Sequence, residues 1–116
     1  MLTGMVFDNV ELDQNRISRV VRLRYSASER ISFHSIISGT PNGTLLLQIS
    51  DDPVEDEALV SNWIDYTDSE VNILGVTQLL VNVKDITFRW AKLVYISVGS
   101  TGFITTNFVL VNRHRL

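Results

Sequence analysis

The chain has 116 residues, of which 45% are hydrophobic and 20% are charged, and its formal net charge at pH 7 is −3. This length predicts one domain with a core large enough to fold alone, and the small negative charge argues against a protein that neutralises nucleic-acid phosphates. The absence of cysteine excludes disulfides and thiolate chemistry, which is consistent with assembly in a reducing cytoplasm.

The first 29 residues are expected to form an N-terminal arm and the first strands. Residues 1–15 mix apolar with acidic and amide side chains, which fits either a short strand or an arm that orders only against a neighbour. From Ile17 to Tyr25, apolar side chains alternate with arginines, so we expect one strand with a basic outer face. The chain shows neither a basic and then apolar leader nor an apolar run of about 18 residues. Neither secretion nor a membrane contact is therefore expected.

Residues 30–116 are expected to form the body of the domain, organised around residues 31–50. Ile31, Phe33 and Ile37 alternate with polar side chains, and Leu45 and Leu47 repeat the pattern on the return. A cluster of Gly, Pro and Asn at residues 39–43 separates the two runs. We therefore expect a β-hairpin here.

An acidic loop follows at residues 51–57, with Asp51 and Asp52 at its start. Pro53 ends the preceding strand, and residues 55–62 are expected to form one or two helical turns. Together with the basic first quarter, the loop gives the chain two oppositely charged patches. Such patches suit head-to-tail contact between copies, although two separate solvated faces are the simpler interpretation.

The second half contains further extended runs at residues 78–83, 88–98 and 103–111, the last two joined by a turn at residues 99–102. Large apolar side chains on both faces of residues 88–98 predict a strand that is covered on both sides. Seven or eight short strands without a long helix predict an all-β fold, a single-domain antiparallel β-sandwich of jelly-roll or immunoglobulin-like type.

The sequence shows no recognisable catalytic, cofactor or metal site, so we expect a non-enzymatic protein without a cofactor. His34 and His114 are far apart and lack neighbouring metal ligands, and no Gly-x-Ser-x-Gly motif occurs. The acidic loop lacks the glycine of the twelve-residue calcium loop. Trp63 and Tyr66 could form a sugar-stacking platform, but aromatic side chains in apolar strands more often belong to a core.

Five segments resemble, in order and spacing, a family of small virion structural proteins of tailed bacteriophages. They are SGTPNGT at residues 38–44, LLLQISDD at 45–52, NWID at 62–65, WAKLVY at 90–95 and GSTG at 99–102. The match spans about residues 30–111, whereas the basic N-terminal segment and the insertion at residues 53–61 fall outside the pattern.

This resemblance implies a capsid decoration or cement protein located in the virion and assembled in the host cytoplasm. Its implied partners are the major capsid protein or other virion subunits, with the chain itself a homo-oligomer such as a trimer. A tail or connector component and a carbohydrate-binding module for host attachment remain alternatives. We expect the interface to include ten residues from the N-terminal segment, the acidic loop and the strand that follows it: Phe7, Val10, Leu12, Arg16, Arg19, Arg22, Arg24, Asp51, Asp52 and Trp63.

Overall fold

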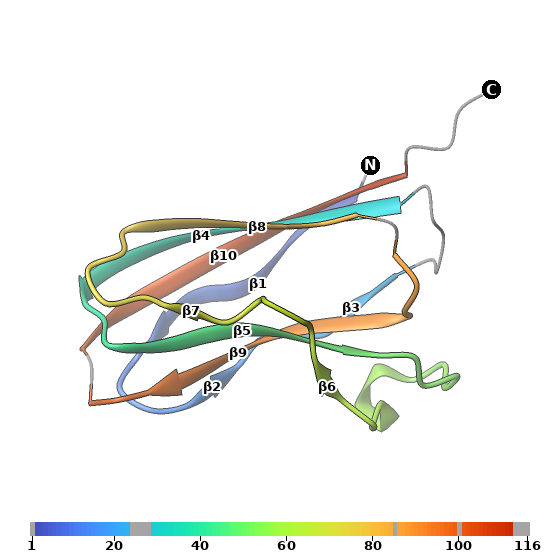
Figure 1. Cartoon of the computed structure of the whole chain (residues 1–116), viewed down its shortest axis with the longest axis horizontal. Coiled ribbons are helices and arrows are strands. Elements are labelled where there is room, and N and C mark those ends of the chain that lie inside the picture. Colours follow the sequence, from blue (N-terminus) through green and yellow to red (C-terminus); the bar gives the residue numbers. More distant parts are fainter. Residues whose placement is uncertain (1, 24–28, 85, 100, 113–116) are drawn as a thin grey trace.

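The computed structural model describes residues 2–23, 29–84, 86–99 and 101–112, and it is built from two facing antiparallel sheets (Figure 1). The strands are β1 (Leu2–Glu11), β2 (Arg16–Ile17), β3 (Val21–Arg22), β4 (Glu29–Thr40), β5 (Gly43–Ser50), β6 (Ile64–Asp65), β7 (Val71–Asn72), β8 (Gln78–Val83), β9 (Trp90–Ser97) and β10 (Thr101–Asn112). One sheet, sheet A, has the order β1-β10-β4-β8. The other, sheet B, has the order β2-β9-β5-β6, and β3 and β7 pair with β9 and β5. The predicted all-β sandwich is therefore confirmed.

The pairing pattern is that of a jelly roll. β2 and β3 share one strand position beside β9, and β6 and β7 share one beside β5, which leaves eight positions in chain order. The first position pairs with the eighth, the second with the seventh, the third with the sixth and the fourth with the fifth. This nesting is a ribbon of paired strands rolled into two sheets, and it selects the jelly roll over the immunoglobulin-like alternative.

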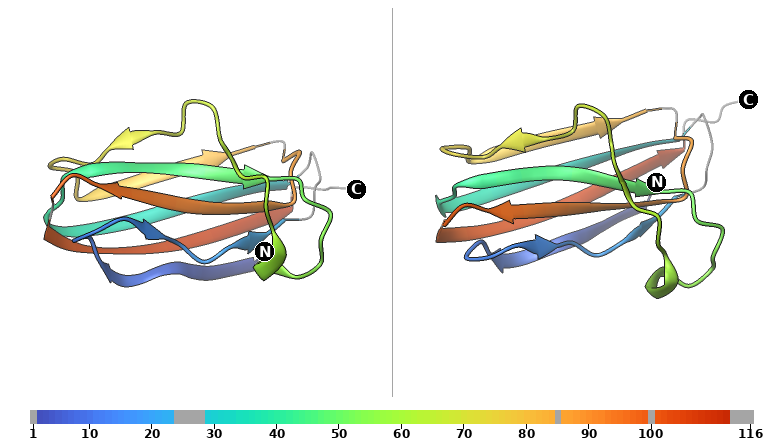
Figure 2. Two further views of the ribbon diagram at one scale, coloured as in Figure 1. Left: turned by 90° about the horizontal axis from the view of Figure 1, so that it is seen from below. Right: turned by 60° about the horizontal axis from the view of Figure 1, so that its bottom comes forward.

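The predicted hairpin at residues 31–50 is wrong, although both of its strands exist. β4 lies in sheet A and β5 lies in sheet B, so the turn between them carries the chain from one sheet to the other (Figure 2). β9 and β10 are divided between the sheets in the same way. Gly39 instead lies opposite Gly102 of β10, and a Cβ on Gly102 would come 2.1 Å from the Ser38 carbonyl oxygen. Two glycines thus allow β4 and β10 to approach closely at this end.

The N-terminal segment is an integral strand rather than an arm. β1 pairs with β10 from Leu2↔Leu110 to Glu11↔Phe103, and two bulges interrupt the register. The expected single strand at residues 17–25 is also interrupted, because Ser18 turns its buried hydroxyl toward β9 and accepts a hydrogen bond from the Leu93 amide at 2.8 Å. Arg19 then donates its backbone N–H to the Val6 carbonyl at 3.1 Å, which links the two sheets at this edge.

The core lies between the sheets and follows the alternation expected from the sequence. β4 contributes Ile31, Phe33 and Ile37, and β5 contributes Leu45 and Leu47. The other buried apolar side chains of this cluster are Val6, Phe7, Leu12, Val21, Leu23, Ile73, Val83, Ile86, Phe88, Ala91, Leu93, Tyr95, Ile104 and Leu110. Within the described residues, no helix is long and apolar enough to cross a membrane.

Candidate interaction surfaces

Three of the expected interface residues face the domain's own core. Phe7 and Leu12 are buried in the core cluster, and Val10 packs against it. Because β1 is held in sheet A by β10, the buried side chains of Phe7 and Leu12 are not available to a partner, whereas Val10 keeps part of its surface exposed. The apolar content of the first twelve residues therefore reflects core formation.

The basic segment and the acidic loop contact each other within one chain. Arg22 Nη2 lies 2.6 Å from Glu55 Oε2, and Arg89 Nε lies 3.2 Å from Asp51 Oδ1. Arg16 pairs with Asp13 at 2.7 Å. The opposite charges that suggested head-to-tail contact between copies are thus partly neutralised inside the molecule. Arg19 is exposed, and Arg24 lies outside the described residues.

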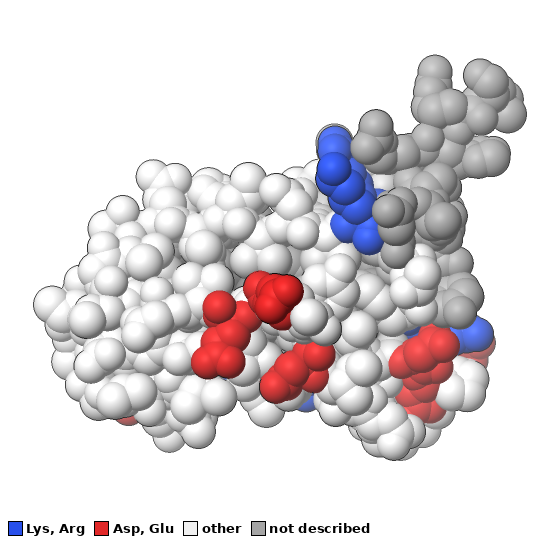
Figure 3. All heavy atoms as spheres, viewed as in Figure 1, with Lys and Arg blue, Asp and Glu red and all other residues white. Residues whose placement is uncertain are grey.

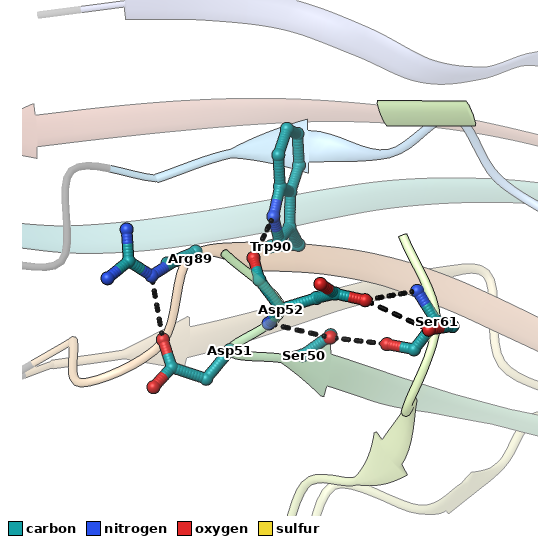
Figure 4. A network of polar contacts seen from close by, with 6 residues as sticks. All are labelled: Ser50, Asp51, Asp52, Ser61, Arg89 and Trp90. Carbon is teal, nitrogen blue, oxygen red and sulfur yellow. Dashed lines mark hydrogen bonds and ion pairs between the residues drawn. The ribbon is translucent and has the colours of Figure 1, made fainter. Parts of the chain in front are cut away.

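Trp90 anchors the acidic loop to the outer face of sheet B. Its indole is only 2% exposed, and its Nε1 donates a hydrogen bond to the Asp52 carbonyl oxygen at 3.0 Å (Figure 4). The Arg22 guanidinium lies 5.6 Å from the ring centroid, in the range of a cation–π contact. Trp90 does not belong to the cluster between the sheets, so the loop and Arg22 enclose it from outside.

Ser50 and Asp52 fix the two ends of the loop. The buried Ser50 hydroxyl donates to the Ser61 carbonyl at 2.6 Å and accepts from the Asp52 amide at 3.2 Å (Figure 4). The Asp52 carboxylate accepts from the Ser61 amide at 3.0 Å and from the Ser61 hydroxyl at 2.9 Å. These two bonds to the ionised form hold the pKa of Asp52 below its ordinary value of 3.8. Between the ends, the expected helical turns reduce to one 3₁₀ turn at Glu57–Leu59, capped by Asp56.

Trp63 and Tyr66 do not form an open aromatic platform. Lys92 Nζ lies 4.3 Å from the Trp63 ring centroid and occupies that side of the ring, while burial lowers the pKa of Lys92. Tyr66 packs against the core and meets Phe88 edge to face, with centroids 5.9 Å apart. A sugar ring would therefore have to displace Lys92 before it could stack on that side of Trp63.

Acidic side chains also gather along the sandwich edge that carries β6 and β7 (Figure 3). Asp65, Asp68 and Glu70 are exposed in this stretch of the chain. No group of three or more His, Cys, Asp or Glu side chains that could hold a metal ion occurs among the described residues. This edge therefore acts as a solvated, negatively charged border.

The outer face of sheet A is the surface that sequence reasoning missed. It exposes Ile36 and Leu80, which are 52% and 58% accessible, together with Met5 and Phe103. His34 lies at its centre with Nε2 3.2 Å from Gln78 Oε1, as expected for an exposed histidine. The signal was present in the sequence, because the outward positions of residues 31–40 and 101–111 carry hydroxyl, amide and apolar groups in place of charges.

Comparison with known proteins gives the fold and no family. Neither a protein-family model nor a curated protein sequence matches the chain. Among solved structures, the chain is similar to the SPBc2 prophage-derived protein YomS, with a TM-score of 0.55, 10% identity, and coverage of 95% of this chain and 92% of that one.

Two further solved structures are similar to the chain. One is the K3 adhesin domain of Lys-gingipain from Porphyromonas gingivalis, with a TM-score of 0.54, 11% identity, and coverage of 94% and 71%. The other comes from the capsid of the picornavirus equine rhinitis A virus, with a TM-score of 0.53, 10% identity, and coverage of 99% and 76%. At these identities the likeness establishes the class of protein, a single-domain β-sandwich, and nothing finer.

Proposed function

We propose that this chain is a non-enzymatic structural subunit of a bacteriophage virion, acting as a capsid decoration or cement protein. The observation that carries the proposal is the outer face of sheet A. This face is broad, has no charged side chain near its centre and is not covered by any other described part of the chain. A face of this kind gains free energy when a partner removes its exposed apolar groups from water.

Two further observations support a place in a virion. The segments at residues 38–52, 62–65, 90–95 and 99–102 resemble small virion proteins of tailed phages, and the fold is shared with a prophage-derived protein and a viral capsid protein. The partner on this proposal is the major capsid protein or another virion subunit. Adhesion then comes from burial at the interface and involves no bond-making step.

The proposal is tested by binding to assembled shells that lack this chain. Purified wild-type protein is expected to sediment with shells formed by the major capsid protein of the same phage or prophage. It should also raise the temperature at which those shells disassemble. An Ile36→Lys variant places a charge on the outer face of sheet A. It is expected to reduce the amount of protein that sediments with the shells at least tenfold.

The matched control is Ile96→Lys. Ile96 is exposed to a similar degree, but it lies on the outer face of sheet B. Binding of Ile96→Lys to shells at the wild-type level, together with weaker binding of Ile36→Lys, supports the outer face of sheet A as the binding surface. Failure of the wild-type chain to bind shells, tails or connectors would overturn it, and sugar binding that is lost in Trp63→Ala would favour the carbohydrate-binding alternative.

A further inference from the structure

The outer face of sheet A is a regular array of uncharged side chains. The strand register places them in rows that cross the four strands. The central row contains Leu80, His34, Asn107 and Met5. The row on one side contains Asn82, Ser32, Val109 and Thr3, and the row on the other side contains Gln78, Ile36 and Thr105. A hollow of about 580 Å³ lies over part of this array and is lined by residues of β4, β8 and β10.

Charge is confined to the margins of this face. Arg30 lies at one end of β4, and Asp8 and Glu11 lie on the edge strand β1. This distribution contrasts with the rest of a chain that carries a net charge of −3 and exposes acidic groups along β6, β7 and the loop after β5. Two copies would repel each other through those acidic surfaces, whereas the centre of the outer face of sheet A presents no such barrier.

The polar groups on this face are of a kind that can pair with themselves. Hydroxyl and amide side chains each carry both a donor and an acceptor, so two identical groups can exchange a hydrogen bond, whereas two carboxylates or two ammonium groups cannot. Ser32 Oγ already donates to Asn82 Oδ1 at 2.5 Å on this face. Apolar side chains such as Ile36 and Leu80 would likewise be removed from water by contact with apolar side chains of a second copy.

The size of the face is sufficient for an interface between two copies. Its strands contain 10, 12, 12 and 6 residues. At about 3.3 Å per residue and about 4.8 Å between strands, the face covers roughly 600 Å². Two such faces bury roughly 1,200 Å² in total, which is the lower end of the range for specific protein interfaces.

From these observations we infer that a second copy of this chain docks on the outer face of sheet A, sheet against sheet, about a two-fold axis near His34. The two outer faces then meet at the usual spacing of stacked sheets, and every residue of the interface occurs twice. The inference goes beyond the proposed function by naming a second copy of the chain as a partner of the same face, so that pairing in free solution and binding to a shell compete for it. It does not depend on that function, since the pairing needs only this chain.

The test is the mass of the full chain in solution as a function of concentration, measured by sedimentation equilibrium. Wild-type protein is expected to be in a reversible equilibrium between monomer and dimer. His34 occupies the centre of the face and is exposed, so His34→Glu and His34→Lys should each fold normally and raise the dimer dissociation constant at least tenfold, because the two-fold axis brings two like charges together. The control Ile96→Glu, on the outer face of sheet B, should leave the constant unchanged.

Mixing the two His34 variants provides the decisive result. A mixture of His34→Glu and His34→Lys should recover dimerisation, because each contact then joins opposite charges across the axis. A wild-type chain that stays monomeric at every concentration would overturn the inference, as would equal weakening by His34→Glu and Ile96→Glu, or a mixture that does not recover. Shell binding by a strictly monomeric chain would remove this inference alone, and a dimer that binds no virion component would remove the proposed function alone.

Discussion

The outer faces of the two sheets differ in how far the chain itself covers them. Sheet B is covered at one end by its own acidic loop, which encloses Trp90 and pairs Glu55 with Arg22 and Asp51 with Arg89. Sheet A carries no such cover within the described residues, and Ile36 and Leu80 remain more than half exposed. The chain therefore covers part of one outer face with its own loop and leaves the other open within the described residues.

The largest expected effect is on the covered face, at Trp90. Trp90→Ala removes a buried indole and its hydrogen bond to the Asp52 carbonyl, and it should lower the free energy of unfolding by about 3–5 kcal/mol. Urea denaturation followed by circular dichroism measures the change. Phe103→Ala on the open face is the matched aromatic control and should cost less than about 1 kcal/mol, because its ring is partly exposed. Equal costs at the two sites would show that the loop does not cover sheet B in solution.

A closer comparison uses two aliphatic residues at outward positions of the two sheets. Leu46 is 7% exposed and lies outside the core cluster, whereas Ile36 is 52% exposed. Leu46→Ala should cost about 2–4 kcal/mol, and Ile36→Ala should cost under about 1 kcal/mol. Thermal unfolding at low protein concentration gives both values without a contribution from association. A large cost at Ile36 under these conditions would mean that something in this chain covers sheet A.

Alternation along the sequence correctly predicted which residues face the core, but it could not predict which strands pair. Ile31, Phe33, Leu45 and Leu47 are buried as expected, yet β4 and β5 belong to different sheets. The alternation of side chains determines which face of a strand is buried, whereas strand pairing depends on the path of the turn. The Gly-Pro-Asn cluster suits a hairpin turn and a crossing between sheets equally.

The surfaces were harder to predict for a related reason. The basic and acidic runs predict two separate charged patches, either solvated or in contact with another copy, but Arg22 and Glu55 are 33 residues apart and meet in the folded chain. Phe7 and Leu12 are apolar in a mixed segment, and only the pairing of β1 with β10 shows that they complete the core. An uncovered sheet face leaves no motif at all, because its signal is the absence of charge at alternate positions.

The network that ties down the loop gives a smaller expected effect. Ser50→Ala removes the hydroxyl that joins the Asp52 amide to the Ser61 carbonyl, and it should lower the free energy of unfolding by about 1–3 kcal/mol because both groups lose a partner. Chemical denaturation measures the loss, and amide hydrogen exchange at Ser61 should rise more than exchange in β4. Unchanged exchange at Ser61 would show that the other contacts of the loop, including the bonds between Asp52 and Ser61, hold it without the Ser50 hydroxyl.

The smallest expected effect is an acid dependence of the same loop. The folded chain holds the pKa of Asp52 below its ordinary value of 3.8 through the two Ser61 hydrogen bonds, so the folded state binds a proton less readily than the unfolded state. This contribution to stability is fully present above about pH 4 to 5 and is lost as the pH falls through the lowered pKa.

Chemical shifts of the Ser61 amide and of the Trp90 indole N–H, followed from pH 6 to pH 2, should report loosening of the loop while sheet A keeps its shifts. Asp52→Asn should abolish that acid transition, because no proton can then bind at this position. Glu57→Gln removes a carboxylate from the same loop, leaves the Ser61 contacts in place and should retain the transition. If Glu57→Gln abolished it as well, the acid response would belong to the charge of the whole loop and not to the bonds between Asp52 and Ser61.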